Sequence, residues 1–216
     1  MKSTRITQIL SIMLALCAGA TLPILIGSTQ LTEPHSVKSE VPYCVSPPSV
    51  PEQATFDGET IDLRRYDRRE RMDREMMSFT YMHSTTMLML KRANRYFPIV
   101  EPILKANGIP DDFKYLMVIE SSLNPIARSP SGAAGLWQFM PATGREFGLE
   151  VNDNIDERYN IEKATIAACK YFKQAYAKYG DWMAVSAAYN AGQGRISSQL
   201  DKQLADHAMD LWLVEE

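Results

Sequence analysis

DDFKYLMVIESS, residues 111–122, is the stretch that decides the fold of this chain. Apolar residues recur along it at intervals of three and four, which is the spacing of one face of an α-helix. This face consists of Phe113, Leu116, Met117 and Glu120. Because the opposite face is apolar as well, we expect a helix that is buried nearly all round. Asp111 or Asp112 is expected to cap its start, and Asn124-Pro125 to stop it.

Glu120 is the acidic residue of that apolar face. Burial disfavours a charged carboxylate, and the nearby C-terminus of the helix dipole is negative, so both effects raise the expected pKa of Glu120. A carboxyl group that stays protonated near neutral pH can act as a general acid and protonate a glycosidic oxygen. The alternative is a structural glutamate that is ion-paired by an arginine or held by backbone amides.

The helical spacing continues over nearly the whole chain beyond residue 60, and no run of residues alternates in the manner of a strand. An all-α fold is therefore predicted. Helices are expected over about 62–82, 85–96, 98–108, 161–179 and 182–190, with a weakly specified helical piece from Ile196 onward. Gly108, Gly180 and Gly192 are expected to end three of them. We expect the methionines and leucines of 85–96 to lie in the core.

Charge excludes one class of partner. The formal net charge is -3, whereas a surface that binds nucleic acid needs a concentrated excess of Lys and Arg. The arginines of 62–82 alternate with acids at helical spacing, which indicates a solvated, ion-paired face. We therefore expect no nucleic-acid partner.

The N-terminal region has the composition of a targeting segment and a linker. Lys2 and Arg5 precede an apolar run from Ile9 to Ile26, so residues 1–27 are predicted to be a signal peptide or an N-terminal membrane anchor. Whether this leader is cleaved, retained or lipidated at Cys17 is left open. Residues 28–60 are rich in Pro, Ser, Thr and Glu and predict a linker, and 61–96 predict a helical extension.

Two polar segments accompany the Glu120 helix. SSLNPIARSPSGAAGLWQFMPATG, residues 121–144, predicts a loop in which Ser129, Ser131 and Gln138 hydrogen-bond sugar hydroxyl and acetamido groups. Trp137 is either a core residue or a sugar platform. SAAYNAG, residues 186–192, places Tyr189 and Asn190 on the last turn of a helix of small residues. The Tyr189 hydroxyl either orients Glu120 or stabilises charge beside the anomeric carbon. The alternative is a tyrosine that is merely packed, with its hydroxyl hydrogen-bonded elsewhere.

ESSLNP, SPSGAAGLWQFMPATG and AYNAG, in this order and spacing, resemble the soluble-type lytic murein transglycosylase (SLT) family. The resemblance is closest to the membrane-bound type D members, and more distant to goose-type lysozymes. It covers about Phe97 to Ile196 and implies a lysozyme-like, all-α catalytic domain over 97–216. It also implies that Glu120 is the catalytic acid and base, that Ser129, Ser131 and Gln138 line glycan subsites, and that Tyr189 with Asn190 completes the wall.

The reaction implied by the resemblance is non-hydrolytic cleavage of peptidoglycan between N-acetylmuramic acid and N-acetylglucosamine. Glu120 would protonate the bridging oxygen and then deprotonate the sugar's own 6-hydroxyl, which leaves a 1,6-anhydromuramic end. One carboxylate is enough for this reaction, whereas ordinary glycosidases use two. A hydrolytic, lysozyme-like reaction would need a second acid, for which the open candidates are Glu146, Glu150, Asp153, Asp156 and Glu162.

The chain departs from the family pattern at its end, because it stops at LWLVEE, before the usual Glu-Thr pair and tyrosine. The catalytic domain is therefore expected to be truncated. This leaves two alternatives to an active enzyme, namely a weak or inactive peptidoglycan-binding relative and an unrelated helical interaction protein. Cleavage within strands or at their ends is left open.

No cluster of metal ligands and no phosphate-binding glycine loop occurs in the sequence, so neither a metal nor a cofactor is expected. The expected partners are peptidoglycan glycan strands and, through the N-terminus, the membrane of the cell envelope. We expect a monomer that is exported to the cell envelope.

Overall fold

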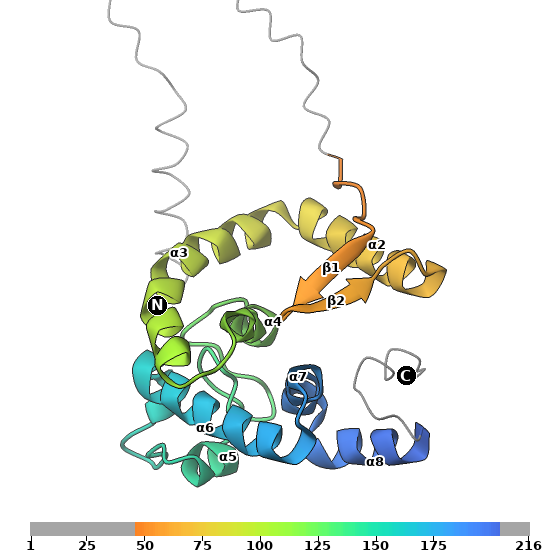
Figure 1. Ribbon diagram of the computed structural model, residues 1–216. Coiled ribbons are helices and arrows are strands. Elements are labelled where there is room, and N and C mark those ends of the chain that lie inside the picture. The colour runs from red at the N-terminus through yellow and green to blue at the C-terminus, as the bar shows by residue number, and fades with distance from the viewer. Residues whose placement is uncertain (1–45, 204–216) are drawn as a thin grey trace, which may run out of the picture. The chain divides into compact units, whose positions relative to one another are not determined.

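The computed structural model describes residues 46–203, so the predicted leader 1–27, most of the predicted linker and the last residues of the predicted catalytic domain lie outside the described residues. Figure 1 shows a helical fold with one small hairpin. The elements are β1 (Gln53–Phe56), β2 (Glu59–Asp62), α2 (Tyr66–Tyr81), α3 (His83–Ala106), η1 (Asp111–Tyr115), α4 (Leu116–Ser121), α5 (Pro141–Glu146), η2 (Glu157–Tyr159), α6 (Ile161–Tyr179), α7 (Trp182–Ala191) and α8 (Gln193–Gln203). The all-α prediction is thus confirmed for the described residues, apart from that hairpin.

The hairpin corrects the prediction of a linker up to residue 60. β1 and β2 pair antiparallel, with Phe56 opposite Glu59, so that Asp57 and Gly58 form a two-residue turn. Both turn residues have positive φ, 50° and 79°, which is the geometry that Asp-Gly turns adopt between twisted strands. The signal for this hairpin was therefore present in the sequence, inside a stretch whose composition is typical of a linker.

α3 is a single helix, although two helices were predicted on either side of Phe97. Pro98 and Pro102 lie inside it, and both are exposed. They are four residues apart and therefore share one face, where the carbonyl groups that lose a partner can bind water. The opposite face is buried through Tyr96, Val100 and Leu104, and this packing holds the helix together across the prolines. Figure 1 shows that α3 curves along its length.

The start of α3 is more exposed than predicted. Met89 is buried, but Met87, Leu88 and Leu90 are about half exposed, so the expected core stripe over 85–96 is only partly formed. α2 buries none of its residues among the described part of the chain, and its charges lie in solvent, as in the exposed ion pair of Arg74 with Glu75. The predicted solvated face of this helix is therefore confirmed.

α6 lies at the centre of the main core. Phe172 on α6 contacts Phe113 and Trp137 edge to face, with ring centroids 4.7 and 5.7 Å apart, and all three side chains are fully buried. Such aromatic packing buries much apolar area and stabilises the fold. A second, smaller cluster of Val50, Ile61 and Leu63 packs the hairpin against partly buried methionines of α2 and against Met183 on α7.

The predicted bounds of α6 and α7 are confirmed almost to the residue. Asp181 caps α7 by accepting hydrogen bonds from the amides of Met183 and Ala184. Gly180 has a φ of 65° and ends α6, and Gly192 ends α7. The helical piece expected from Ile196 onward is also confirmed, as part of α8. No described helix is both long and apolar enough to span a membrane.

The 111–122 stretch differs in detail from its prediction. It starts as the 3₁₀-helix η1 and continues as α4, and neither predicted cap forms, because the Asp111 carboxylate binds Lys114 and that of Asp112 accepts the amide of Asp57. Phe113, Leu116 and Met117 are buried as expected. Tyr115 and Ile119, however, are 49% and 67% exposed, so one face of α4 is open rather than buried all round.

Candidate active site

Glu120 lies on the last turn of α4, beside the open face of that helix. Its side chain is half-buried, and burial raises the pKa of its carboxyl group above the ordinary value. Within residues 46–203 the carboxylate forms no hydrogen bond and no ion pair. The alternative of an arginine-paired structural glutamate is therefore wrong for the described residues, and Glu120 is a carboxyl group that is biased toward protonation.

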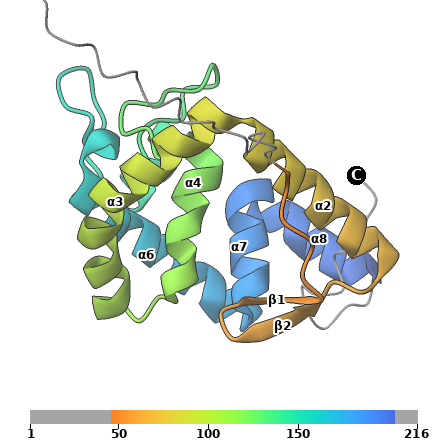
Figure 2. The same cartoon turned by 90° about the horizontal axis from the view of Figure 1, so that it is seen from above.

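Tyr189 lies close enough to Glu120 to interact with its charge. Figure 2 shows α4 and α7, which carry these two residues, running next to each other. The pKa of Tyr189 is raised well above the ordinary value, mainly by burial and then by the negative charge of Glu120. The Tyr189 ring packs edge-on against the Tyr171 ring, with ring centroids 5.2 Å apart, and this packing fixes its position.

The Tyr189 hydroxyl donates a hydrogen bond of 2.5 Å to the carbonyl oxygen of Trp137. This bond joins α7 to the loop that follows α4, and it uses the single hydroxyl proton. The phenolic oxygen can still accept a hydrogen bond through its lone pairs. Trp137 itself is fully buried, and its indole nitrogen donates a hydrogen bond to the Thr165 hydroxyl. Trp137 is therefore a core residue, as one of its two predictions stated, and the alternative prediction of a sugar platform is wrong.

The loop 122–139 folds back on itself through its own polar residues. The Ser129 hydroxyl accepts the amide of Ala133, and the Gln138 amide nitrogen donates to the carbonyl oxygens of Gly135 and Ala127 at 2.7 and 3.3 Å. Both side chains thus shape the loop, which leaves the Gln138 amide oxygen to contact a ligand. Ser131 is exposed at the tip of the loop. Asn190 is exposed on the last turn of α7.

Arg158 is the main residue at this site that sequence reasoning missed. Its side chain is 5% exposed and donates to the carbonyl oxygens of Gly132 and Phe139 at 2.7 and 2.9 Å. The same guanidinium binds both oxygens of Asp156, which holds the pKa of Asp156 below its ordinary value. Arg158 therefore clamps the two limbs of the loop. No sequence pattern indicates this role, because the hydrogen-bond acceptors are backbone carbonyls 19 and 26 residues away.

Gly135 explains why the loop can approach Arg158 so closely. Its φ is 78°, and a Cβ atom on it would lie 2.0 Å from the carbonyl oxygen of Arg158. No side chain fits in that space. This glycine is therefore required both by its backbone angle and by the close approach of a second backbone.

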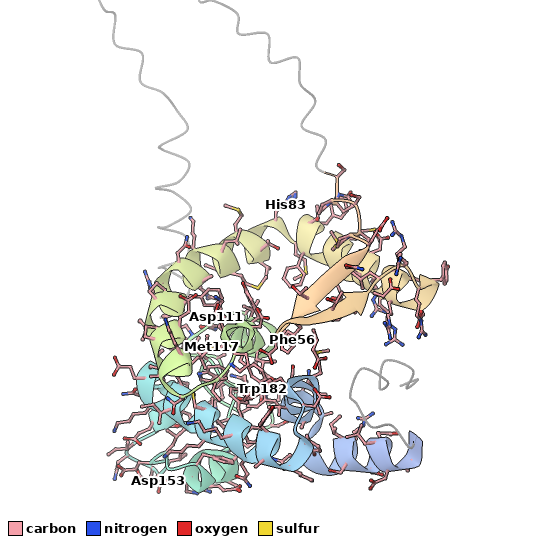
Figure 3. All side chains as sticks on the ribbon, in the orientation of Figure 1. Phe56, His83, Asp111, Met117, Asp153 and Trp182 are labelled. Atoms are coloured by element: carbon pink, nitrogen blue, oxygen red, sulfur yellow. The ribbon has the colours of Figure 1, made fainter. Side chains whose placement is uncertain are left out.

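Five carboxylates were candidates for a second catalytic acid, and none of them contributes to the raised pKa of Glu120. Asp156 is held by Arg158, and Figure 3 shows Asp153 at the edge of the fold, apart from Met117 of α4. Burial is the cause of the raised pKa of Glu120, without a contribution from a neighbouring charge. The geometry therefore presents one carboxyl group with a shifted pKa rather than an interacting pair.

Three other hollows of the described residues lie away from Glu120. Hollows of about 460, 610 and 600 Å³ lie against α2 or against the second half of α3, and Glu120 lines none of these three. Within residues 46–203 no three His, Cys, Asp or Glu side chains come together as they would around a metal ion.

Comparison with known proteins gives a family match and several relatives. The model of the transglycosylase SLT domain family matches residues 97–209. The chain is 32% identical over 146 residues to membrane-bound lytic murein transglycosylase D of Escherichia coli K12, covering 67% of this chain and 31% of that protein. It is 34% identical over 94 residues to soluble lytic murein transglycosylase of the same organism, covering 40% of this chain and 15% of that one.

Among solved structures, an inactive mutant of the lytic transglycosylase Slt from Pseudomonas aeruginosa aligns with a TM-score of 0.43 and 28% identity, covering 51% of this chain and 19% of that one. The chain spans about a third of the length of the type D enzyme. The family match includes Glu120, the loop 122–139 and Tyr189. On the strength of that match, which covers just over half of its residues, this chain belongs to the transglycosylase SLT domain family.

Proposed function

We propose that this chain is a lytic transglycosylase that cleaves the β-1,4 bond between N-acetylmuramic acid and N-acetylglucosamine in peptidoglycan. The observation that carries the proposal is Glu120, a half-buried carboxyl group with a raised pKa and no hydrogen-bond or ion-pair partner within residues 46–203. Burial makes the protonated form of this carboxyl group easier to reach than that of an ordinary glutamate, which favours a role as proton donor. The names of the relatives, which are lytic murein transglycosylases, support the choice of substrate.

The reaction needs one proton donor that later becomes a base. Glu120 gives its proton to the bridging oxygen as the glycosidic bond breaks, and the leaving N-acetylglucosamine takes up that proton as a hydroxyl. The Glu120 carboxylate then accepts the proton of the 6-hydroxyl of the muramic residue, whose oxygen attacks the anomeric carbon. The 1,6-anhydro end is closed, Glu120 is protonated again, and no water is consumed.

The surroundings of Glu120 suit this sequence of steps. Tyr189 lies beside it, fixed by ring packing, and its phenolic oxygen can accept a hydrogen bond from the protonated carboxyl group. The exposed Ile119 of α4 and Tyr115 at the end of η1 form an open apolar face on which a sugar ring can pack. We assign Ser129, Ser131, Gln138 and Asn190 to the binding of the strand, as the sequence predicts.

The cell envelope is the place where peptidoglycan is available, so the proposal includes export. The predicted signal or anchor at 1–27 and the linker that follows it support this location. The type D relative carries "membrane-bound" in its name, and we propose that this chain also works beside a membrane as a monomer.

The test is mass spectrometry of fragments that the full chain releases from purified peptidoglycan. The chain is compared with Glu120→Gln and with Glu162→Gln, a matched change at an exposed carboxylate on the first turn of α6. Anhydromuramic ends from the parent and from Glu162→Gln, but not from Glu120→Gln, are expected. Reducing ends would indicate a hydrolase instead, and a folded parent that releases no fragments would contradict the proposal.

A further inference from the structure

We propose that Arg92, on the helical extension, is a positioning residue that holds the backbone turn directly after Glu120 in its active geometry. The inference rests on the proposed role of Glu120 as the acid and base. Within residues 46–203, no hydrogen bond or ion pair joins Arg92 to Glu120 or to the residues assigned to strand binding, and it acts through the carbonyl group of Ser122.

α4 cannot fix the direction of Glu120 by itself. It is six residues long, which is too short for a stable isolated helix, and Glu120 is next to its last residue. The carboxyl group also forms no hydrogen bond within residues 46–203 in this structure. The position of this side chain is therefore set by whatever holds the C-terminal end of α4.

That end adopts an unusual backbone conformation. Ser122 and Leu123 have φ values of 51° and 56°, and neither is a glycine. Such residues lie in a conformation that costs energy for side chains with a Cβ atom and that persists only when the surroundings impose it. The amides of Ser122 and Leu123 still bond to Val118 and Met117 of α4, so the strained turn is directly coupled to the helix that carries Glu120.

Two side-chain hydrogen bonds link this turn to segments outside α4. On the loop side, the Ser121 hydroxyl lies 2.9 Å from the carbonyl oxygen of Leu136. On the side of α3, the Nη1 atom of Arg92 donates a hydrogen bond of 3.0 Å to the carbonyl oxygen of Ser122. The last carbonyl groups of a helix lack donors within the helix, and a cation is favourable there, so Arg92 satisfies both needs.

The effect of Arg92 on Glu120 is one of position rather than of charge. Burial is the cause of the raised pKa of Glu120, and the charge of Arg92 does not contribute to it. Removal of Arg92 should therefore leave the pH dependence of the reaction in place while it lowers the rate. This distinguishes Arg92 from a residue that tunes the acidity of Glu120.

Arg92 also lies outside the part of the chain that matches the family model, which starts at residue 97. The extension thus contributes more than a connection to the N-terminal region, because it braces the turn that follows the catalytic glutamate. Arg95 provides a matched control. It lies on the same helix three residues further on, is exposed, and forms no hydrogen bond or ion pair with the described part of the chain.

The experiment compares the full chain with Arg92→Met, Arg92→Lys and Arg95→Met in two measurements. Fragment release from peptidoglycan should show a kcat that is lowered roughly tenfold to a hundredfold by Arg92→Met, because small misplacements of a catalytic group have effects of this size. KM and the pH profile should stay as in the parent. Arg92→Lys should recover part of the rate, and Arg95→Met should match the parent.

Hydrogen exchange provides a measurement that does not depend on activity. The amides of Ser122 and Leu123 should exchange faster in Arg92→Met, while amides within α6 keep the parent rate. If Arg92→Met does not fold, Arg92→Lys and Arg92→Gln take its place in both measurements. Unchanged exchange of the two amides, an unchanged kcat in an active chain, or an equal loss in Arg95→Met would overturn the inference. A parent that releases no fragments would count against the proposed function, and the exchange result would still decide whether Arg92 holds the turn.

Discussion

The loop 122–139 has almost no regular secondary structure, whereas α2 is sixteen residues of uninterrupted helix. The loop is nevertheless the segment that is more firmly tied to the fold. Its backbone is clamped by the buried guanidinium of Arg158, and Trp137 within it is fully buried. α2, in contrast, contributes no buried residue and presents its charges to solvent.

The difference shows that burial and long-range hydrogen bonds, rather than a regular backbone, determine how firmly a segment is held. Residues that act on a ligand are often placed on loops, and such a loop must be rigid to be useful. Here the rigidity is supplied by a buried cation and a glycine that permits close approach.

Gly135→Ala should be the most damaging change in the loop. The new Cβ atom would lie 2.0 Å from the carbonyl oxygen of Arg158 at a φ of 78°, so both the steric clash and the backbone strain act together. A loss of about 3 kcal/mol or more in the free energy of unfolding is expected from urea titration. Gly132→Ala is the matched control, because its φ is 93° but nothing lies within 4 Å of the added atom. A similar loss in both variants would show that the close approach is unimportant.

Arg158→Met should remove the clamp and leave two loop carbonyls and Asp156 without their donor. Removal of one partner of a buried ion pair costs about 3–5 kcal/mol, and we expect about 2–4 because Asp156 is 26% exposed. Arg145→Met, which removes one exposed hydrogen bond to Val151, should cost much less. Equal melting temperatures for these two variants would contradict the clamp.

The clamp also predicts how stability depends on pH. Arg158 lowers the pKa of Asp156, so the native state binds fewer protons at this group than the unfolded state. The stability from this pair is present above the unfolded pKa of about 3.9 and is lost as the pH falls through the lower native value. The gap in stability between the parent and Asp156→Asn should therefore narrow from pH 7 to pH 3. A gap that stays constant or widens at low pH would rule this coupling out.

Arg74→Gln on α2 should have the smallest effect. Arg74 forms an ion pair with Glu75 in which both side chains are more than half exposed. Such pairs contribute little to stability, so no measurable shift of the melting temperature is expected. A loss comparable with that of Arg158→Met would mean that α2 is held as firmly as the loop.

The sequence predicted best where local signals and tertiary contacts agree. α6 and α7 start at capping residues and end at Gly180 and Gly192, so their bounds follow from short-range chemistry. Prediction failed at α3, because buried contacts on one face carry the helix through Pro98 and Pro102. It failed again at the hairpin, where the Asp57-Gly58 turn lies in a region that has the composition of a linker.

The chemistry of the candidate site could be predicted from the sequence, but the residues that hold its backbone in place could not. The position of Glu120 on an apolar face indicated a raised pKa, and the structure agrees. The roles of Arg92 and Arg158 could not be predicted, because each binds main-chain oxygens that are distant in sequence, and any carbonyl in the chain presents the same chemistry. Only the fold determines which carbonyl each arginine reaches.

The most direct test of the account is the rate at which Glu120→Gln releases fragments from peptidoglycan, measured beside its affinity for glycan strands. The amide cannot donate and reaccept the proton, but it fills the same space, so folding and binding should be kept. We predict a kcat lowered by about a thousandfold, within the range for loss of a general acid, at nearly unchanged affinity. A folded Glu120→Gln variant that keeps more than about a tenth of the parent rate would contradict the assignment of Glu120 as acid and base.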